Sequence, residues 1–524
     1  MATFNVLTET WLTAVDFDGR EREYSLLELL AKAHQLRAIV DPSPPIQFGL
    51  YRFAITFVQD ALRLVEFEDL EDALTEGQFH RETFKRYAET VGWQRFDLFD
   101  ADTPFMQTRP VPGDAQNAKS VVELFYHLPT GTNVVHFFHM QEHEHAVAPP
   151  VAARALCSIA PFMTSGGAGY SPSINGTPPW YVLAVGRNLF ETLLLNCCVM
   201  PISGLDHTTP SIWARDDSFT PRAEKGVRSL GEGFTWQPRQ VRLLPSEGGT
   251  CTYTGRPSPV LIRQIVWGPG HKFGGQDQWL DPHVAYIHDD KRGTLPLRPR
   301  ADRPLWRDYG PLFLLRHAQG SGHRSSRPLI VTQLARLKEE RIIPRETAEQ
   351  FEVYGMRVDK AKVFEWQYER LPLRTALLQN PEAGLQVQHA LDMAEKVAKS
   401  LEVAVRQHAP RDGGGNPRAL NGIFHHVSWQ FWTLLHEFFE AEYLEKLAIQ
   451  TPGDEHARLS LLDAWKAALR SIGWQCLDEA SQLVGTSAEA LRRQVLARNA
   501  FARNLAIALG DVSAKEGRKG MKRR

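Results

Sequence analysis

Residues 159–196 read IAPFMTSGGAGYSPSINGTPPWYVLAVGRNLFETLLLN, and no charged side chain occurs in this stretch before Arg187. A membrane-spanning helix needs about 20 consecutive apolar residues, whereas glycines and prolines interrupt this segment repeatedly. The pattern predicts a glycine turn at 165–169, then an extended apolar run, then a helix that begins near Asn188. Such a turn either connects buried elements tightly or presents bare backbone amides to a ligand, because glycine has no side chain.

Length and composition limit the class of protein. A chain of 524 residues is too long for one ordinary core, so two or three domains are expected. The net charge of −1, with 23% charged residues, argues against a protein that coats nucleic acid by bulk electrostatics. The cysteines form no CxxC pair, and the N-terminus has no secretion-signal pattern. We therefore expect a cytoplasmic protein with reduced thiols and no membrane association.

Local signals predict a mixed α/β region in the first part of the chain. Short β-like runs within 3–16 lead to an Asp18-Gly19 turn, and Ser25 with Glu28 forms a capping-box motif before a helix. Further elements are expected as helices at 47–64 and 76–91, as a strand at 240–245 leading to a hairpin near 247–250, and as a strand at 328–337.

The last third of the chain has a different pattern. Helical segments separated by short loops are typical of an antiparallel bundle, and Thr486 with Glu489 forms a capping-box motif before the last one. The segments are expected at 383–408, 421–449, 454–484 and 486–510. The sequence thus predicts a multidomain α+β protein, with a mixed α/β N-terminal domain at 1–375, an all-α four-helix bundle at 383–510 and a basic disordered tail at 511–524.

Motif searches give no sustained case for an enzyme. The chain has no GxSxG, Walker A, HExxH or protein-kinase signature, and the glycine turn does not fit GxGxxG. A histidine cluster provides the one catalytic alternative, since imidazole and carboxylate groups are common metal ligands. Its members are His136, His139, His143 and His145, with Glu142 and Glu144. A metal-dependent hydrolase therefore remains the alternative to a non-catalytic protein, and no metal or other cofactor is expected.

Several segments, in order along the chain, carry a family resemblance. They are FNVLTETWLTAVDFDGREREYSLLELLAKAHQL (4–36), TPFMQ (103–107), GTPPWYVLAVGRNLFETLLLN (176–196), GFTWQPRQVRLLP (233–245), CTYTGRPSPVLIRQIVWGPG (251–270), DPHVAYI (281–287) and GMRVDKAKVFEWQYERLPL (355–373). Together they resemble the CasA family, the large subunits of type I-E CRISPR Cascade surveillance complexes. The resemblance implies a non-catalytic subunit that recognises the protospacer-adjacent motif (PAM) in double-stranded DNA.

The same resemblance implies partners and a sequence of events. The partners are the other Cascade subunits, the CRISPR guide RNA, double-stranded target DNA and a helicase-nuclease that docks on this subunit. In such systems base pairing reads the target sequence while protein reads the short motif. Motif binding is followed by strand separation and formation of an R-loop with the guide RNA.

Particular residues match the family's functional positions. The glycine turn corresponds to the element that reads the DNA motif, a second loop lies close to the motif, and Arg256 is one of the cations nearest to the family's basic finger. The motif-binding residues implied are Gly166, Gly167, Ala168, Gly169, Phe137, Phe138, His139 and Arg256. Asp359 and Lys360 occupy the tip of a strand-separating wedge, where the family carries glutamine. The basic run at 294–307 offers Arg298, Arg300 and Arg303 as phosphate contacts beside a nucleic-acid groove.

Overall fold

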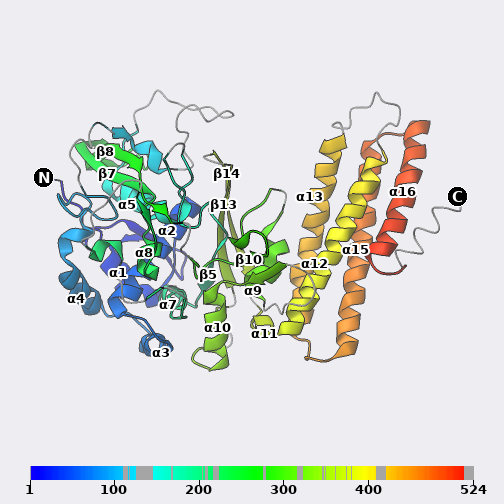
Figure 1. Ribbon diagram of the computed structural model, residues 1–524, viewed down its shortest axis with the longest axis horizontal. Helices are drawn as coiled ribbons and strands as arrows, with labels where there is room; N and C mark the ends of the chain where they lie inside the picture. Colours follow the sequence, from blue (N-terminus) through cyan, green and yellow to red (C-terminus); the bar gives the residue numbers. More distant parts are fainter. Residues whose placement is uncertain are drawn as a thin grey trace. The chain divides into compact units, whose positions relative to one another are not determined.

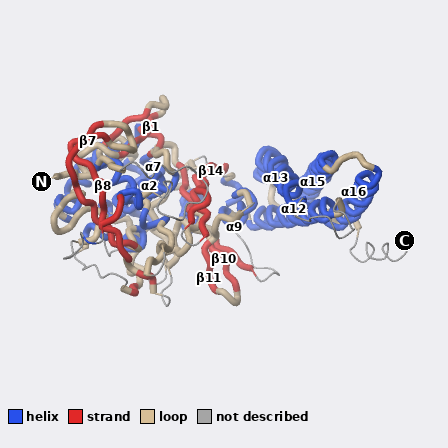
Figure 2. Tube along the Cα trace, turned by 90° about the horizontal axis from the view of Figure 1, so that it is seen from above, coloured by secondary structure: helices blue, strands red, loops and turns tan. Residues whose placement is uncertain are grey.

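Strands and helices are mixed in the first of two units of the computed structural model, and the described residues of the second unit are helical (Figure 1, Figure 2). The first unit comprises residues 1–301 and 322–373, and the second comprises 302–321 and 374–524. The structure describes residues 2–109, 116, 118–125, 145–166, 169–202, 205–206, 211–215, 223–274, 279–301, 303–314, 323–344, 347–348, 350–359, 362–372, 374–378, 380–408 and 420–512. The predicted α/β class with a helical C-terminal region is confirmed.

The described elements of the first unit are short, apart from two long hairpins and one long helix. They are β1 (Leu12–Asp16), β2 (Glu21–Tyr24), α1 (Leu26–Ala31), β3 (Leu36–Ile39), α2 (Pro44–Leu62), α3 (Phe67–Glu76), α4 (Arg81–Val91), β4 (Ala118–Ser120), α5 (Pro149–Cys157), α6 (Ile159–Phe162), β5 (Tyr181–Val185), α7 (Leu189–Leu195), β6 (Glu224–Lys225), α8 (Leu230–Phe234), β7 (Arg239–Thr250), β8 (Pro257–Pro269), β9 (Lys272–Phe273), β10 (Tyr286–Asp289), β11 (Gly293–Pro296), β12 (His323–Ser326), α10 (Leu329–Glu339), β13 (Gln350–Asp359) and β14 (Lys362–Pro372).

Helix α2 forms the centre of the first unit. It is buried on almost every side from Pro45 to Val58, and it contacts α5, α7, α8 and β13. A helix that is apolar around its whole circumference must be enclosed by other elements to fold stably. The apolar sequence of the 47–64 segment therefore both predicts the helix and explains why the rest of the unit packs around it.

Two antiparallel sheets carry the long hairpins. One has the strand order β4-β8-β7, and the other has the order β14-β13-β5. In the second sheet, β13 lies between β14 and the short strand β5, which follows the glycine-rich segment in the chain. The remaining sheets have the orders β2-β1-β3 and β11-β10-β12, with a parallel pair β6-β9.

Several local predictions are confirmed. Ser25 caps α1 in a reciprocal capping box with Glu28, and Gly19 has a φ of 79° in the turn between β1 and β2. Asn188 caps α7 by accepting a hydrogen bond from the Glu191 amide. In each case a short polar side chain or a glycine satisfies a purely local geometric demand.

Other local predictions are wrong. The segment 328–337 is not a strand but the start of α10, in which Ile330, Val331, Leu334 and Leu337 are buried at helical spacing. The segment 76–91 is not one helix, because Gly77 ends α3 in a left-handed conformation and α4 begins only at Arg81.

The β-hairpin predicted after the 240–245 strand is confirmed, but its turn does not lie at 247–250. Strand β7 instead continues through Gly248 to Thr250, with Gly249 opposite Ser258 of β8, and the chain reverses at 251–256. A Cβ on Gly248 would lie 2.5 Å from the Ser258 carbonyl oxygen, so these glycines permit close pairing of the two strands rather than a turn.

The second unit consists of helices in its described residues. They are α9 (Tyr309–Phe313), α11 (Thr375–Leu378), α12 (Pro381–Arg406), α13 (Asn421–Phe438), a π-helical segment (Phe439–Leu444), α14 (Glu445–Ala448), α15 (Glu455–Leu483) and α16 (Ala488–Ala508). The cap of α16 is Ser487, one residue later than the sequence motif predicts. The Trp465 indole N–H donates to the Ala390 carbonyl across α15 and α12 at 2.9 Å.

Part of the chain before residue 322 belongs to the second unit. The ring of Trp306 stacks on His436, with centroids 5.5 Å apart and planes inclined by 7°, and also contacts Phe439. These contacts explain why residues 302–321 group with the helices. In the described part of the chain, none of the helices is long and apolar enough to cross a membrane.

The capping box yields a stability prediction. Ser25→Ala removes the side chain that accepts from the Glu28 amide, and we expect a loss of about 1 kcal/mol in the free energy of unfolding. Ser43→Ala is the matched control, because Ser43 is also a buried N-cap residue but makes no side-chain capping bond. Chemical denaturation of both variants tests this, and equal destabilisation would contradict it.

Candidate nucleic-acid interface

A buried arginine holds the two sides of the glycine turn together. The Arg239 guanidinium, at the start of β7, donates to the carbonyl oxygens of Thr164 and Ser171, which lie before and after the turn. Its Cζ atom lies 5.0 Å from the ring centroid of Tyr170. A planar guanidinium can bridge two acceptors in a fixed geometry, so Arg239 fixes the width of the turn at its base.

The outermost described glycines of the turn are exposed. Gly166 and Gly169 are both solvent-accessible, and Gly169 has a φ of 85°, which a residue with a side chain adopts only with strain. A Cβ on Gly166 would meet Arg239 and Tyr170 at 3.4 Å, an ordinary contact distance. Arg239 therefore holds the two ends of the turn, while Gly166 and Gly169 are exposed and can present their backbone to a ligand.

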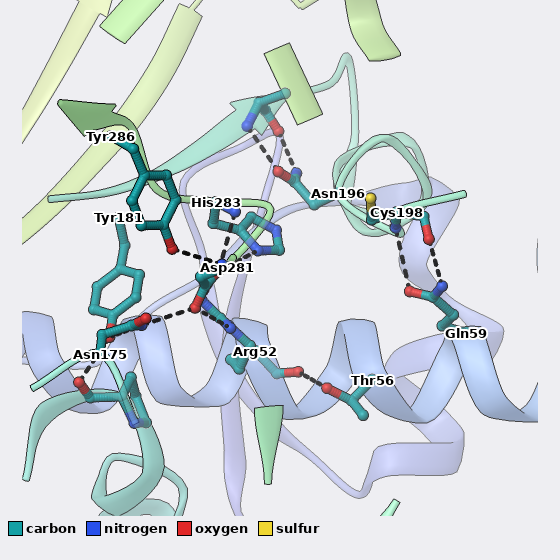
Figure 3. A network of polar contacts seen from close by, with 12 residues as sticks. Arg52, Thr56, Gln59, Asn175, Tyr181, Asn196, Cys198, Asp281, His283 and Tyr286 are labelled. Carbon is teal, nitrogen blue, oxygen red and sulfur yellow. Dashed lines mark hydrogen bonds and ion pairs between the residues drawn. The ribbon is translucent and has the colours of Figure 1, made fainter. Parts of the chain in front are cut away.

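A second set of contacts holds the chain after the turn (Figure 3). Asp281 accepts two hydrogen bonds from the Arg52 guanidinium, at 2.9 and 3.2 Å, and a third from the Asn175 side chain at 3.0 Å. Tyr181 donates to the Pro161 carbonyl at 2.8 Å. The segment from 161 to 181 thus leaves and re-enters the core at two points fixed by buried polar groups.

The groups around Asp281 and His283 set the charge states of these two side chains. Burial alone would raise the pKa of Asp281, but the charges of Arg52 and His283 and their hydrogen bonds outweigh it and hold the pKa well below its usual value. Burial, together with the charge of Arg52, lowers the pKa of His283 to about 4. At neutral pH the network therefore contains an ionised carboxylate, a guanidinium and a neutral imidazole.

The register of the β5–β13 pair sets the direction of the predicted wedge hairpin. Val185 pairs with Gln350 and Tyr181 pairs with Tyr354, so residues 355–359 continue past the N-terminal end of β5. At about 3.3 Å per residue, these residues project roughly 16 Å beyond that end. The glycine-rich segment enters β5 from the same end. Strand pairing therefore places the hairpin at the end of β5 where the glycine-rich segment joins that strand.

A close contact fixes the hairpin at this point. A Cβ on Gly355 would lie 2.4 Å from the Trp180 ring and 2.7 Å from Pro299, so neither neighbour leaves space for a side chain. Asp359 pairs with Lys362 at the end of the ladder and is exposed. Residues 360–361 lie outside the described part of the chain.

The predicted phosphate-binding arginines have different surroundings. Arg298 donates to the carbonyl oxygens of Thr177 and Asn175, so it lies on the chain that leads from the glycine turn. Arg300 is exposed, and it also interacts with another group of the protein. Arg303 belongs to the second unit, where it forms ion pairs with Asp308 at 2.9 Å and Glu395 at 2.7 Å.

Arg256 lies in the connection at the far end of the β7–β8 hairpin. It is exposed and forms an ion pair of 2.9 Å with Glu23. Arg239, which holds the glycine turn, is at the opposite end of β7, and an extended strand of this length covers roughly 35 Å. The structure therefore places Arg298 on the chain that leads from the glycine turn, Asp359 at the end of the β13–β14 hairpin, and Arg256 at the end of β7 opposite to Arg239.

The remaining predicted residues lie outside the described part of the chain. They are Gly167, Ala168, Phe137, Phe138, His139 and Lys360, together with His136, Glu142, His143 and Glu144 of the histidine cluster. Within the described ranges, no group of three or more His, Cys, Asp or Glu side chains is placed to hold a metal ion. The roles assigned to these residues stay predictions.

Sequence analysis missed two features of this region. Arg239 carried no local signal, because its two acceptor carbonyls lie about 70 residues earlier in the chain. The aromatic residues of β14 did carry a signal, since Phe364, Trp366 and Tyr368 alternate with polar residues at the period of a strand. That alternation places all three side chains on one face.

Comparisons with known proteins give a consistent family assignment. The model of the family described as CRISPR-associated protein Cse1 matches residues 5–476. A curated relative, the CRISPR-associated protein CasA/Cse1 of Thermus thermophilus, is 27% identical over 521 residues, which cover 96% of this chain and 97% of the relative.

Solved structures share the fold. Cse1 of Thermobifida fusca superposes with a TM-score of 0.75 at 21% identity, covering 97% of this chain and 98% of that one. A chain from a structure titled CRISPR RNA-guided surveillance complex gives a TM-score of 0.73 at 19% identity, covering 96% and 100%.

The Arg239 contacts lead to a second stability prediction. Arg239→Lys keeps the charge but cannot bridge both carbonyls, and we expect a loss of about 2 kcal/mol in the free energy of unfolding. Arg242→Lys, at a partly exposed position on the same strand, should cost less than about 0.5 kcal/mol. Denaturant unfolding measures both changes. A neutral Arg239→Lys would mean that the turn does not depend on this side chain.

Proposed function

The chain belongs to the CRISPR-associated Cse1 family, and from this premise we propose that it is the large, non-catalytic subunit of a type I-E Cascade complex. In this proposal it recognises the protospacer-adjacent motif in double-stranded DNA. It then helps to open the duplex so that the guide RNA can form an R-loop. The other Cascade subunits and the guide RNA are its partners, in keeping with the surveillance-complex chain that shares its fold.

One observation carries the proposal. The glycine-rich segment and the β13–β14 hairpin extend past the same end of β5, with Gly355 packed against Trp180. A motif reader and a strand-separating element must act on neighbouring base pairs, so they have to lie side by side. The strand pairing supports that arrangement for two segments that are far apart in the sequence.

The glycine turn is suited to the minor groove. That groove is about 6 Å wide and distinguishes mainly A·T from G·C pairs. A backbone without side chains fits such a space, and its amides can donate to base and sugar acceptors. The anchoring by Arg239 favours recognition because the two ends of the turn are already held in place when DNA binds.

Strand separation is assigned to the hairpin tip. Insertion of a side chain between base steps costs a few kcal/mol of stacking, and pairing with the guide RNA offsets that cost. Lys360 would act by its bulk and charge, because an ammonium group donates hydrogen bonds but cannot accept them.

The rest of the chain is assigned supporting roles. The helices of residues 383–510 form a four-helix bundle that supports the neighbouring subunits and the target strand, and the domain limits 1–375 and 511–524 belong to the same proposal. The helicase-nuclease docks on this subunit once the R-loop has formed. The protein acts in the cytoplasm.

The function is tested with the complete, guide-loaded complex. We expect R-loops to form on a target that carries the correct motif, and few to form on the same target with that motif changed. When this subunit is omitted, we expect R-loop formation to be lost on both targets. Purified protein should not cleave DNA in the presence of manganese or zinc. Cleavage that disappears in His136→Ala would instead support the metal-dependent hydrolase.

Side chains added to the glycine turn should abolish motif recognition without unfolding the protein. Gly166→Asp and Gly167→Asp introduce bulk and a charge that phosphates repel, whereas Gly166→Ala adds only a Cβ at ordinary contact distance. We expect the Asp variants to lose motif-dependent binding at least tenfold and to keep a melting temperature within a few degrees of the parent. Gly422→Asp, at another exposed glycine with open space around it, is the control. Binding that falls only in proportion to the folded fraction would make the turn a scaffold.

Lys360→Ala separates opening of the duplex from motif binding. We expect slower R-loop formation on intact duplex and nearly normal rates on a target with a pre-formed bubble beside the motif. Lys291→Ala, which removes an exposed cation from the turn between β10 and β11, is the control and should slow opening less. Stopped-flow fluorescence on both substrates measures this, and equal defects on duplex and bubble would show that Lys360 contacts phosphate only.

A further inference from the structure

Strand β14 exposes a row of aromatic rings on one face. Phe364 is 54% exposed, and Trp366 and Tyr368 are each 37% exposed, whereas the residues between them are half-buried. Alternate residues of a strand are about 6.8 Å apart, which is twice the 3.4 Å spacing of consecutive bases in one strand of a duplex. The spacing leaves room for a flat base between successive rings.

The position of this row argues against a purely structural role. In the described sheet β14 is the outermost strand. Edge strands with large exposed apolar side chains promote aggregation and are normally avoided. An aromatic face retained at an edge therefore indicates that a ligand or partner covers it.

Neighbouring side chains hold the rings in place. The Tyr368 hydroxyl donates to Glu352 at 2.9 Å, and its ring lies 5.0 Å from that of the buried Tyr354. The Arg357 guanidinium lies 4.9 Å from the centroid of Phe364. Rings that are already ordered lose little conformational entropy when a ligand stacks on them.

The charges beside the row favour an anionic ligand. Lys362 is an exposed cation at the end nearest the hairpin tip, and Arg370 marks the other end, where it donates to Glu352. The acidic Glu365 is paired with Arg357 at 3.0 Å. Aromatic rings beside an exposed lysine match an unpaired nucleic-acid strand, whose bases stack while a phosphate contacts the ammonium group.

We propose that the β14 face formed by Phe364, Trp366 and Tyr368 is a stacking platform for single-stranded DNA. The inference rests on the proposed function, because the platform begins at the hairpin tip where the duplex would open. A base paired within a duplex cannot insert its faces between these rings, so the platform selects DNA that has already been separated. It would thereby retain one of the two strands and oppose re-annealing.

The test uses the full-length chain and a fluorescein-labelled oligo(dT) of about 12 nucleotides. Fluorescence anisotropy should show that Phe364→Ala/Trp366→Ala weakens binding by about tenfold or more, whereas Phe364→Trp and Trp366→Phe retain it. Trp429→Ala and Phe17→Ala, which remove exposed aromatic side chains elsewhere, should have no effect. Melting temperatures of all variants confirm folding.

The salt dependence distinguishes stacking from charge. The aromatic double variant should keep the slope of log affinity against log salt concentration, because stacking releases no counterions. Lys362→Gln should reduce that slope by about 0.7, the value for one phosphate contact on a single strand. An aromatic variant with unchanged affinity for oligo(dT) overturns the proposal. So does a variant that binds oligo(dT) normally but fails to assemble with the other subunits, since the face would then be a protein-docking surface.

Duplex measurements separate this inference from the proposed function. Motif-dependent binding of intact duplex by the complete complex should be unchanged in the aromatic double variant, while re-annealing of an opened target becomes faster. If motif dependence is absent from the parent complex, the proposed function fails, and the oligo(dT) result still decides whether the platform exists.

Discussion

The buried ion pair between Arg52 and Asp281 is the interaction on which the first unit depends. It joins the central helix α2 to a segment 229 residues away, and both side chains are almost inaccessible to water. Removing charges from water is costly, and such a pair is stable only when its remaining hydrogen bonds are also satisfied. Here Asn175 supplies one of these bonds and the ring of Phe234 covers the guanidinium at 4.1 Å. Loss of either partner would leave an uncompensated buried charge, with a cost of about 3–5 kcal/mol.

The same network explains how an exposed glycine turn can have a defined position. Asn175 ties the chain after the turn to Asp281, and Arg239 ties both sides of the turn to β7. Gly355 fits closely against Trp180, so the β13–β14 hairpin is fixed to the chain that follows the turn. The elements proposed to touch DNA are therefore fixed at their bases by buried contacts, so their bases do not have to be ordered on binding.

Charge has a limited role in this protein. Its net charge is −1, and several arginines that looked available in the sequence are engaged in the structure, Arg303 with acidic partners and Arg298 with backbone carbonyls. Backbone amides of the glycine turn and aromatic rings of β14 are uncharged groups that can still bind nucleic acid. A surface of this kind favours recognition that depends on shape and on unpaired bases over general attraction to phosphate.

The sequence by itself determined the features that depend on local geometry. The apolar α2 segment, the caps at Ser25 and Asn188 and the helical C-terminal region follow from spacing, hydrogen-bonding groups and backbone freedom within a few residues. It failed at 328–337, because a short apolar run fits a buried strand as well as a buried helix and only its neighbours distinguish them. Tertiary structure alone decided that Arg239 holds the two ends of the glycine turn, that Arg303 is paired, and that the β13–β14 hairpin extends past the end of β5 where Gly355 meets Trp180. These facts depend on which distant segments meet, and no local pattern records that.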